Sequence, residues 1–234
     1  MREQLEKEIS RLKRMVSSLA AAVETAVRQA VAAAAEPNSE MAAAVIARDD
    51  AIDRTEITIE EECLKILALH QPVAGDLRYI ITILKVNNEL ERIGDLAVNI
   101  ARHTLDSAEH TRREPAEVID FSEQMQLVRQ MLKRALDALV SRNCLDANEV
   151  MRMDTEVDAI NKQVIERAMA LIAKHPEDVA YYVDAMFISR HLERIGDCTT
   201  NICEDVIYLE LGRIVRHSRL DAGTDLELSD SAGE

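Results

Sequence analysis

The stretch "ELERIGDLAVNI" (residues 89–100) returns about a hundred residues later as "HLERIGDCTTNI" (residues 191–202), with eight of the twelve positions identical. Each copy places a glycine, Gly94 or Gly196, inside a segment of helical periodicity. Glycine there costs about 1 kcal/mol relative to alanine. Each copy also sets a glutamate and an aspartate four residues apart. A locally unfavourable feature that occurs twice indicates a duplicated unit in which the glycine serves a purpose other than helix stability.

Turn-forming stretches divide the chain into six long helical segments, three in each half. They read AAEPNSE (34–40), HQPVAGD (70–76), RREPAE (112–117), SRNCLDANE (141–149) and HPEDV (175–179). Pro72 cannot continue a helix, and Gly75 and Asp76 suit a turn and an N-cap. Pro115 is placed near the first position of the fourth helix, where a missing N–H does no harm. The last helix is expected to end near Gly212.

The sequence therefore predicts an all-α fold of two tandem antiparallel three-helix bundles. We assign the first repeat to residues 1–112 and the second to residues 113–216. Residues 217–234 are polar and acidic, and we expect them to be disordered.

Composition supports long helices and narrows the range of partners. Aromatic residues make up 3% of the 234 residues, with six Gly and four Pro, which argues against sheet. A formal net charge of −15 disfavours nucleic acid and suits cations or basic protein surfaces. The four cysteines have no CxxC spacing, the N-terminus has no signal-peptide pattern, and no uncharged apolar run reaches ~18 residues. We expect a cytoplasmic protein with reduced thiols and no membrane span.

Helical periodicity places a set of carboxylates beside the core and outside it. The predicted core seam of the third helix is Ile83, Val86, Leu90, Ile93, Ala97 and Ile100, and that of the second is Val45, Ile52, Ile59, Cys63 and Ile66. At about 100° per residue, Glu91 and Asp95 lie well over ~90° from the centre of the first of these seams. A stripe about 60° wide beside the other seam consists of Asp49, Asp53, Glu56 and Glu60.

A solvated acidic face explains any one of these residues alone. Together they repel one another, because like charges four residues apart destabilise a helix by roughly 0.2–0.5 kcal/mol. The glycines remove side-chain bulk, so a neighbouring helix or a hydrated ion can approach. We therefore predict a multi-carboxylate cation site on each bundle. All-oxygen ligands suit Mg, Mn, Ca or oxidised iron, as single ions or as a multinuclear cluster. Arg92 and Arg194 leave open the alternative that a guanidinium replaces the cation.

The second half repeats the acidic pattern with fewer acids. Its predicted ligands are Asp154, Asp158, Glu193 and Asp197, which align with Asp49, Asp53, Glu91 and Asp95. The counterparts of Glu56 and Glu60 are Asn161 and Ile165.

At these residues the chain resembles the PhoU family, the accessory regulators of the phosphate-specific transport system. The first-half hallmark reads "QPVAGDLR" (71–78) and "ERIGDLAVNI" (91–100), and the second-half hallmark reads "ERIGDCTTNICE" (193–204). The resemblance covers residues 5–216. It implies a two-bundle fold, frequent homodimerisation, and in some members metal clusters at the E/D-xxx-D motifs, which here are the pairs named above.

The resemblance also implies a function. Family members act negatively on phosphate uptake and on the phosphate-sensing histidine kinase. The expected partners are that kinase and the ATPase subunit of the transporter. Association with the membrane would be peripheral, through those partners only.

A carboxylate-bridged metalloenzyme, either an oxidase or a hydrolase, is the main alternative. None of the six histidines follows a glutamate by three residues, as di-iron bundles require. HExxH and a P-loop are absent, and no Ser or Cys lies in a nucleophile motif. A purely structural coiled coil would need neither the glycine nor the acidic pairs. We therefore predict a regulator that is not an enzyme.

Overall fold

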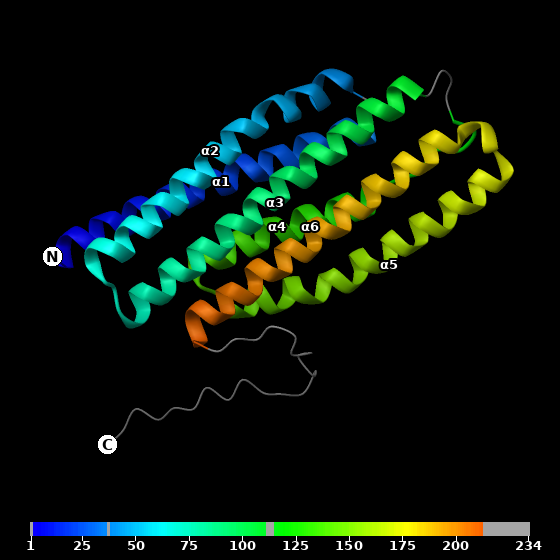
Figure 1. The fold of residues 1–234 in the computed structure, drawn as a ribbon. Coiled ribbons are helices and arrows are strands. Elements are labelled where there is room, and N and C mark those ends of the chain that lie inside the picture. The colour runs from blue at the N-terminus through cyan, green and yellow to red at the C-terminus, as the bar shows by residue number, and fades with distance from the viewer. Residues whose placement is uncertain (1, 37, 111–114, 213–234) are drawn as a thin grey trace.

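The computed structural model describes residues 2–36, 38–110 and 115–212. Its six long helices are α1 (Arg2–Ala35), α2 (Ser39–His70), α3 (Ala74–His110), α4 (Ser122–Ser141), α5 (Cys144–Lys174) and α6 (Val179–Leu211), with one 3-10 turn, η1 (Pro176–Asp178). No strand occurs in these ranges. The helices run up and down in two successive groups of three, which confirms the predicted fold (Figure 1). The tail predicted to be disordered, residues 217–234, lies outside the described ranges.

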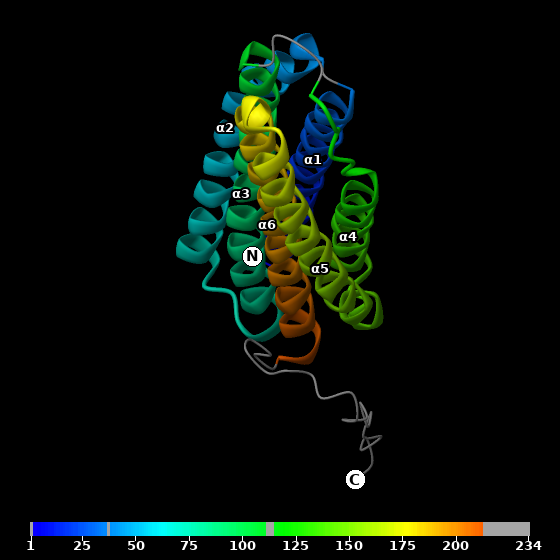
Figure 2. The same cartoon turned by 90° about the vertical axis from the view of Figure 1, so that its right-hand side faces the viewer.

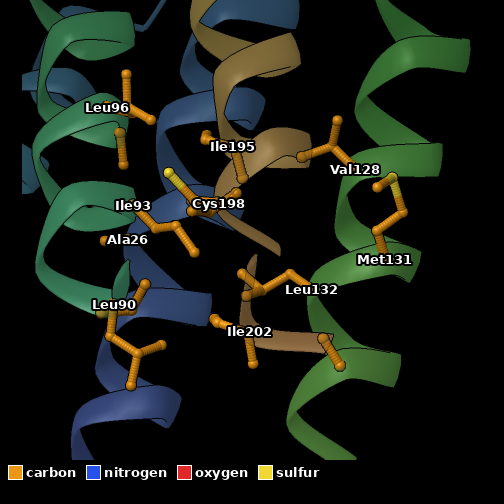
Figure 3. Packing of buried hydrophobic residues seen from close by; sticks show 14 of the residues in the cluster. Ala26, Leu90, Ile93, Leu96, Val128, Met131, Leu132, Ile195, Cys198 and Ile202 are labelled. Atoms are coloured by element: carbon orange, nitrogen blue, oxygen red, sulfur yellow. The ribbon is translucent and has the colours of Figure 1, made fainter. Parts of the chain in front are cut away.

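The two bundles share one hydrophobic core. α3 and α6 lie side by side in the middle of the molecule, with α1 and α2 packed against α3 and with α4 and α5 packed against α6 (Figures 1 and 2). Every residue of the two predicted seams is at most 5% exposed. Figure 3 shows the apolar contact at the centre, where Leu90, Ile93 and Leu96 of α3 lie beside Ile195, Cys198 and Ile202 of α6 and Val128, Met131 and Leu132 of α4. The halves are thus joined by packing as well as by the chain.

The prediction that Pro115 begins the fourth helix is wrong. α4 begins at Ser122, and residues 115–121 are not helical. Backbone N–H groups in this linker donate hydrogen bonds to side chains at the start of the last helix: Ala116 to Asp178 (3.0 Å), Glu117 to Tyr182 (3.4 Å) and Ile119 to Tyr181 (3.1 Å). Because side chains satisfy these donors, the linker needs no helical hydrogen bonds.

The turn between α2 and α3 also differs in detail from its prediction. Gln71 ends α2 in the left-handed conformation (φ 46°), and its N–H bonds to the carbonyl of Leu67. α3 then begins at Ala74, so Gly75 and Asp76 lie in its first turn and Asp76 is not the N-cap. Gln71 therefore supplies the reversal that was assigned to glycine.

Arg78, from the stretch QPVAGDLR, ties α3 to the C-terminal end of α6. Its Nη1 donates a hydrogen bond to the carbonyl oxygen of Leu209 (3.3 Å). α6 ends where predicted, with Gly212 in the left-handed conformation (φ 68°). A Cβ at Gly212 would lie 2.8 Å from Arg78 Nη1, so glycine allows both the turn and the close approach of the guanidinium. The arginine thereby satisfies a carbonyl that the helix end leaves open.

Candidate metal centres

The first acidic face comprises the carboxylates of α2 and α3, namely Asp49, Asp53, Glu56, Glu60, Glu91 and Asp95. Burial raises the pKa of Asp49, and the charges of Asp53 and Asp95 raise it further. Burial likewise raises the pKa of Glu91, and the negative charges of Asp95 and Asp53 raise it further. The structure therefore brings the two helices' carboxylates within electrostatic reach of one another, as the sequence predicted.

One atom of the first acidic face points to a missing positive partner. Asp49 Oδ1 is buried and accepts no hydrogen bond from the described part of the chain. A buried acceptor left in this state costs about 1–3 kcal/mol, more when it is charged. Arg102 lowers the pKa of Asp49 only as a smaller opposing effect. A bound cation would satisfy this oxygen, so the residues present fit the predicted group.

The second acidic face comprises Asp154 and Asp158 of α5 with Glu193 and Asp197 of α6. Burial raises the pKa of Asp154 from its ordinary 3.8 to about 7, and the other three carboxylates add to the effect. Burial also raises the pKa values of Glu193 and Asp197. Asp154 Oδ1 and Glu193 Oε2 are buried without a hydrogen-bond partner among the described residues. This face is the more strained of the two when no cation is bound.

The doubled glycine allows the helices to approach beside these carboxylates. A Cβ at Gly94 would lie 3.2 Å from Ile52 Cγ2 of α2, and one at Gly196 would lie 3.0 Å from Asp154 Oδ1 of α5. Both distances are shorter than ordinary van der Waals contacts. In each half the glycine therefore faces the helix that carries the Asp-xxx-Asp pair, which accounts for its recurrence.

A polar contact between helices is also duplicated, with its residue types changed. In the first half Asn87 Nδ2 donates to Glu56 Oε1 at 3.0 Å. In the second half the aligned residues are Ser189 and Asn161, and Ser189 Oγ donates to Asn161 Oδ1 at 3.0 Å. One carboxylate oxygen of Glu56 therefore already accepts a hydrogen bond from Asn87. In the second half the aligned residue, Asn161, belongs to a buried, uncharged hydrogen-bond network.

An arginine does pair with a predicted metal ligand, but this arginine is Arg190 and not Arg92 or Arg194. Arg92 pairs with Glu89, which is not a predicted ligand, at 3.3 Å. Glu193 accepts a hydrogen bond from Arg190 rather than from Arg194. The spacing of three residues between Arg190 and Glu193 is a signal that could have identified this pair.

Within the described ranges, no three carboxylates of either acidic face offer ligand atoms that all lie within 4.8 Å of one another. Among the described residues, one group of His, Cys, Asp or Glu has three ligand atoms that all lie within 4.8 Å of one another, and it consists of His103, Asp106 and Asp184. This group was not predicted from the sequence. The spacing His-x-x-Asp in α3 could have suggested two members, but no local pattern marks Asp184.

Comparison with known proteins identifies the fold and the repeat together. A family model described as "PhoU domain" matches residues 16–104 and again residues 121–206. The chain belongs to the PhoU family. The two matches to the PhoU domain fall on the two three-helix groups and leave out the linker at residues 115–120.

Relatives in the PhoU family match over most of their length. The Phosphate-specific transport system accessory protein PhoU homolog of Aquifex aeolicus (strain VF5) is 35% identical over 214 residues, covering 92% of this chain and 96% of that protein. The Serratia marcescens accessory protein PhoU is 33% identical over 219 residues, covering 94% and 89%. The crystal structure of PhoU from Pseudomonas aeruginosa has a TM-score of 0.85 at 33% identity, covering 89% of this chain and 99% of that one. As a PhoU-family protein, the chain has a role in the regulation of phosphate transport. None of its described helices is long and apolar enough to cross a membrane.

Proposed function

We propose that this chain acts negatively on phosphate uptake by the phosphate-specific transporter and on the phosphate-sensing histidine kinase. The observation that carries this proposal is the PhoU-domain match over both halves, together with relatives whose names place them in the phosphate-specific transport system. The chain would act on the cytoplasmic side by binding the transporter's ATPase subunit and the kinase, as a homodimer and without catalytic turnover.

The acidic faces supply the chemistry for cation binding in this role. The residues that would hold the ions are Asp49, Asp53, Glu91 and Asp95 in the first half, with Glu56 and Glu60 beside them, and Asp154, Asp158, Glu193 and Asp197 in the second. A bound hard cation would neutralise mutually repelling carboxylates and hold each pair of helices together. The raised pKa values and the unpartnered oxygens of Asp49 and Asp154 support this assignment.

The charge of the protein favours a basic patch on its partners. A net charge of −15 gives long-range attraction to such a patch, and salt weakens attraction between exposed charges. We expect the complex with the ATPase subunit to weaken as salt concentration rises. Binding that strengthens or stays constant between low and physiological salt would contradict a charge-driven interface.

Deletion and complementation test the regulatory role. Loss of the gene should switch on phosphate-starvation genes in phosphate-rich medium, and the unaltered gene should restore repression. Normal repression in the deletion strain would refute the proposal.

Variants test the role of the cation sites. The double variant Asp95→Asn/Asp197→Asn should lose bound metal and repress less well. The matched control Glu24→Gln/Glu166→Gln removes two exposed acids on α1 and α5 outside both faces and should behave as the parent protein. Equal metal content in the two double variants would place any cation elsewhere. A metal-dependent hydrolase or oxidase activity that survives repurification and disappears with Asp95→Asn would favour the enzyme alternative.

A further inference from the structure

A second kind of metal-binding group lies where α3 meets α6, and its residues belong to neither acidic face. His103 and Asp106 are three residues apart in α3 and so share one helix face. Asp184 faces them from α6. His103 Nδ1 and Asp184 Oδ1 are 3.0 Å apart, and one ligand atom from each of the three residues lies within 4.8 Å of the others.

Asp184 is buried with half of its carboxylate unsatisfied. The residue is 8% exposed, and its Oδ2 has no hydrogen-bond partner in the described part of the chain. The hydrogen bond with His103 uses only Oδ1. A buried carboxylate oxygen without a partner is costly unless a positive group binds it. This oxygen is an observation independent of the clustering, and it calls for a cation.

Aromatic rings hold the histidine in place. The ring of His103 stacks on Phe187 of α6, with centroids 4.8 Å apart and planes inclined by 9°. On α6 the ring of His191 lies 5.4 Å from the same imidazole, and its Nδ1 is also buried without a described partner. A ligand whose orientation is fixed by packing loses little freedom when it binds a metal.

The donor set separates this group from the acidic faces. One imidazole nitrogen and two carboxylates suit first-row transition metals, whereas Mg and Ca prefer oxygen alone. Zinc in a tetrahedral site has bonds of about 2.0–2.2 Å to such ligands, which places ligand atoms about 3.3–3.6 Å apart. His103 Nδ1 and Asp184 Oδ1 lie 3.0 Å apart across a hydrogen bond, so metal binding would replace the shared proton and move the two atoms slightly apart.

We propose that His103, Asp106 and Asp184 bind a divalent first-row transition metal, with Zn²⁺ as the first choice, and that the ion links α3 to α6. Three protein ligands leave a fourth position for water. The ion would cross-link the two bundles near the end of α3 and the beginning of α6. It would act independently of any hard cations on the acidic faces.

Titration of chelator-treated, full-length protein with Zn²⁺ and with Co²⁺ tests this site, followed by calorimetry and by the visible absorption of bound Co²⁺. The parent protein should bind one tight equivalent. Asp106→Asn and His103→Gln should each weaken that binding at least about tenfold, since removal of an outer-shell partner of a ligand already costs this much. Asp106 is exposed, so its replacement leaves the core intact.

Two variants make the result decisive. His175→Gln removes a histidine outside the group, and Asp95→Asn/Asp197→Asn removes acids from both acidic faces. Both should keep the tight equivalent. Absence of a tight equivalent in the parent, unchanged affinity in Asp106→Asn, or loss of the equivalent in either of these two variants would overturn the proposal.

Discussion

Asp154→Asn should stabilise the protein when no metal is present, although it alters a predicted ligand. The pKa of Asp154 is raised from 3.8 to about 7, chiefly by burial. At about 1.4 kcal/mol per pKa unit, this corresponds to about 4 kcal/mol of destabilisation when the carboxyl is charged. Asp154 is partly exposed, so solvent screening reduces that figure, and we expect a gain of about 2 kcal/mol. For a chain of this length the melting temperature should rise by about 4–8 °C.

The sign of the pH dependence follows from the same values. Between pH 3.8 and about 7 the folded protein holds a proton that the unfolded chain has released. The stability contributed by this group is therefore lost as the pH rises through that window. The advantage of Asp154→Asn should be absent below about pH 4 and grow up to about pH 7. In excess cation the parent should be more stable than Asp154→Asn, because the parent has the carboxylate ligand and binds the ion more tightly.

Differential scanning fluorimetry at pH 4.5 and 7.5, in chelator and in excess cation, measures all four conditions. Asp137→Asn, at an exposed acid on α4, is the matched control and should stay within about 0.5 kcal/mol of the parent. If Asp154→Asn in chelator at pH 7.5 melts at or below the temperature of the parent, burial of the charged carboxylate does not destabilise the protein. Equal stabilisation by the control would lead to the same conclusion.

Three further predictions concern packing, thiols and the helix end. Gly94→Leu should lower the free energy of unfolding by about 1–3 kcal/mol in urea denaturation, because the side chain must displace Ile52. Gly94→Ala should be nearly neutral, because a gain of about 1 kcal/mol in helix propensity offsets the tight contact of its Cβ, 3.2 Å from Ile52 Cγ2; equal stability of the two variants would contradict close helix approach. Burial raises the pKa of the thiols of Cys63, Cys198 and Cys203 to about 12. Ellman's reagent at pH 8 should therefore modify at most the half-buried Cys144 in folded protein, and rapid modification of a second thiol would contradict this. Arg78→Ala should cost about 1 kcal/mol and speed hydrogen exchange at the C-terminal end of α6, while unchanged exchange there would show that the hydrogen bond to Leu209 contributes nothing.

The periodicity of the sequence predicted which residues lie on the buried face of each helix. The seams around Leu90 and Ile59 were assigned correctly because a buried stripe repeats every three to four residues. The approach of Asp49 to Asp95 was predicted from the same periodicity, which places the acidic stripe of α2 beside its seam. The linker at residues 115–121 could not be predicted, because its backbone donors bond to side chains some sixty residues away.

The candidate metal sites were predictable only in part, because some of their contacts join residues that are far apart in the sequence. The acidic pairs lie four residues apart and are visible in the sequence. His103 and Asp184 are 81 residues apart, and nothing near either one marks the contact between them. Contacts between helices that do not follow one another in the chain thus escape sequence reasoning.

The apolar contact between α3 and α6 bears on how a duplicated chain arises. A protein made of one repeat alone would expose the face of α3 that now packs against α6, and water-exposed apolar patches of this kind promote association. Such a half-length chain would have to cover this surface with the same helix of a second copy. Joining two copies end to end makes that association intramolecular, so it no longer depends on protein concentration. Each half is then free to diverge. The second acidic face has Asn161 and Ile165 where the first has two acids, a difference that a pair of identical subunits cannot develop.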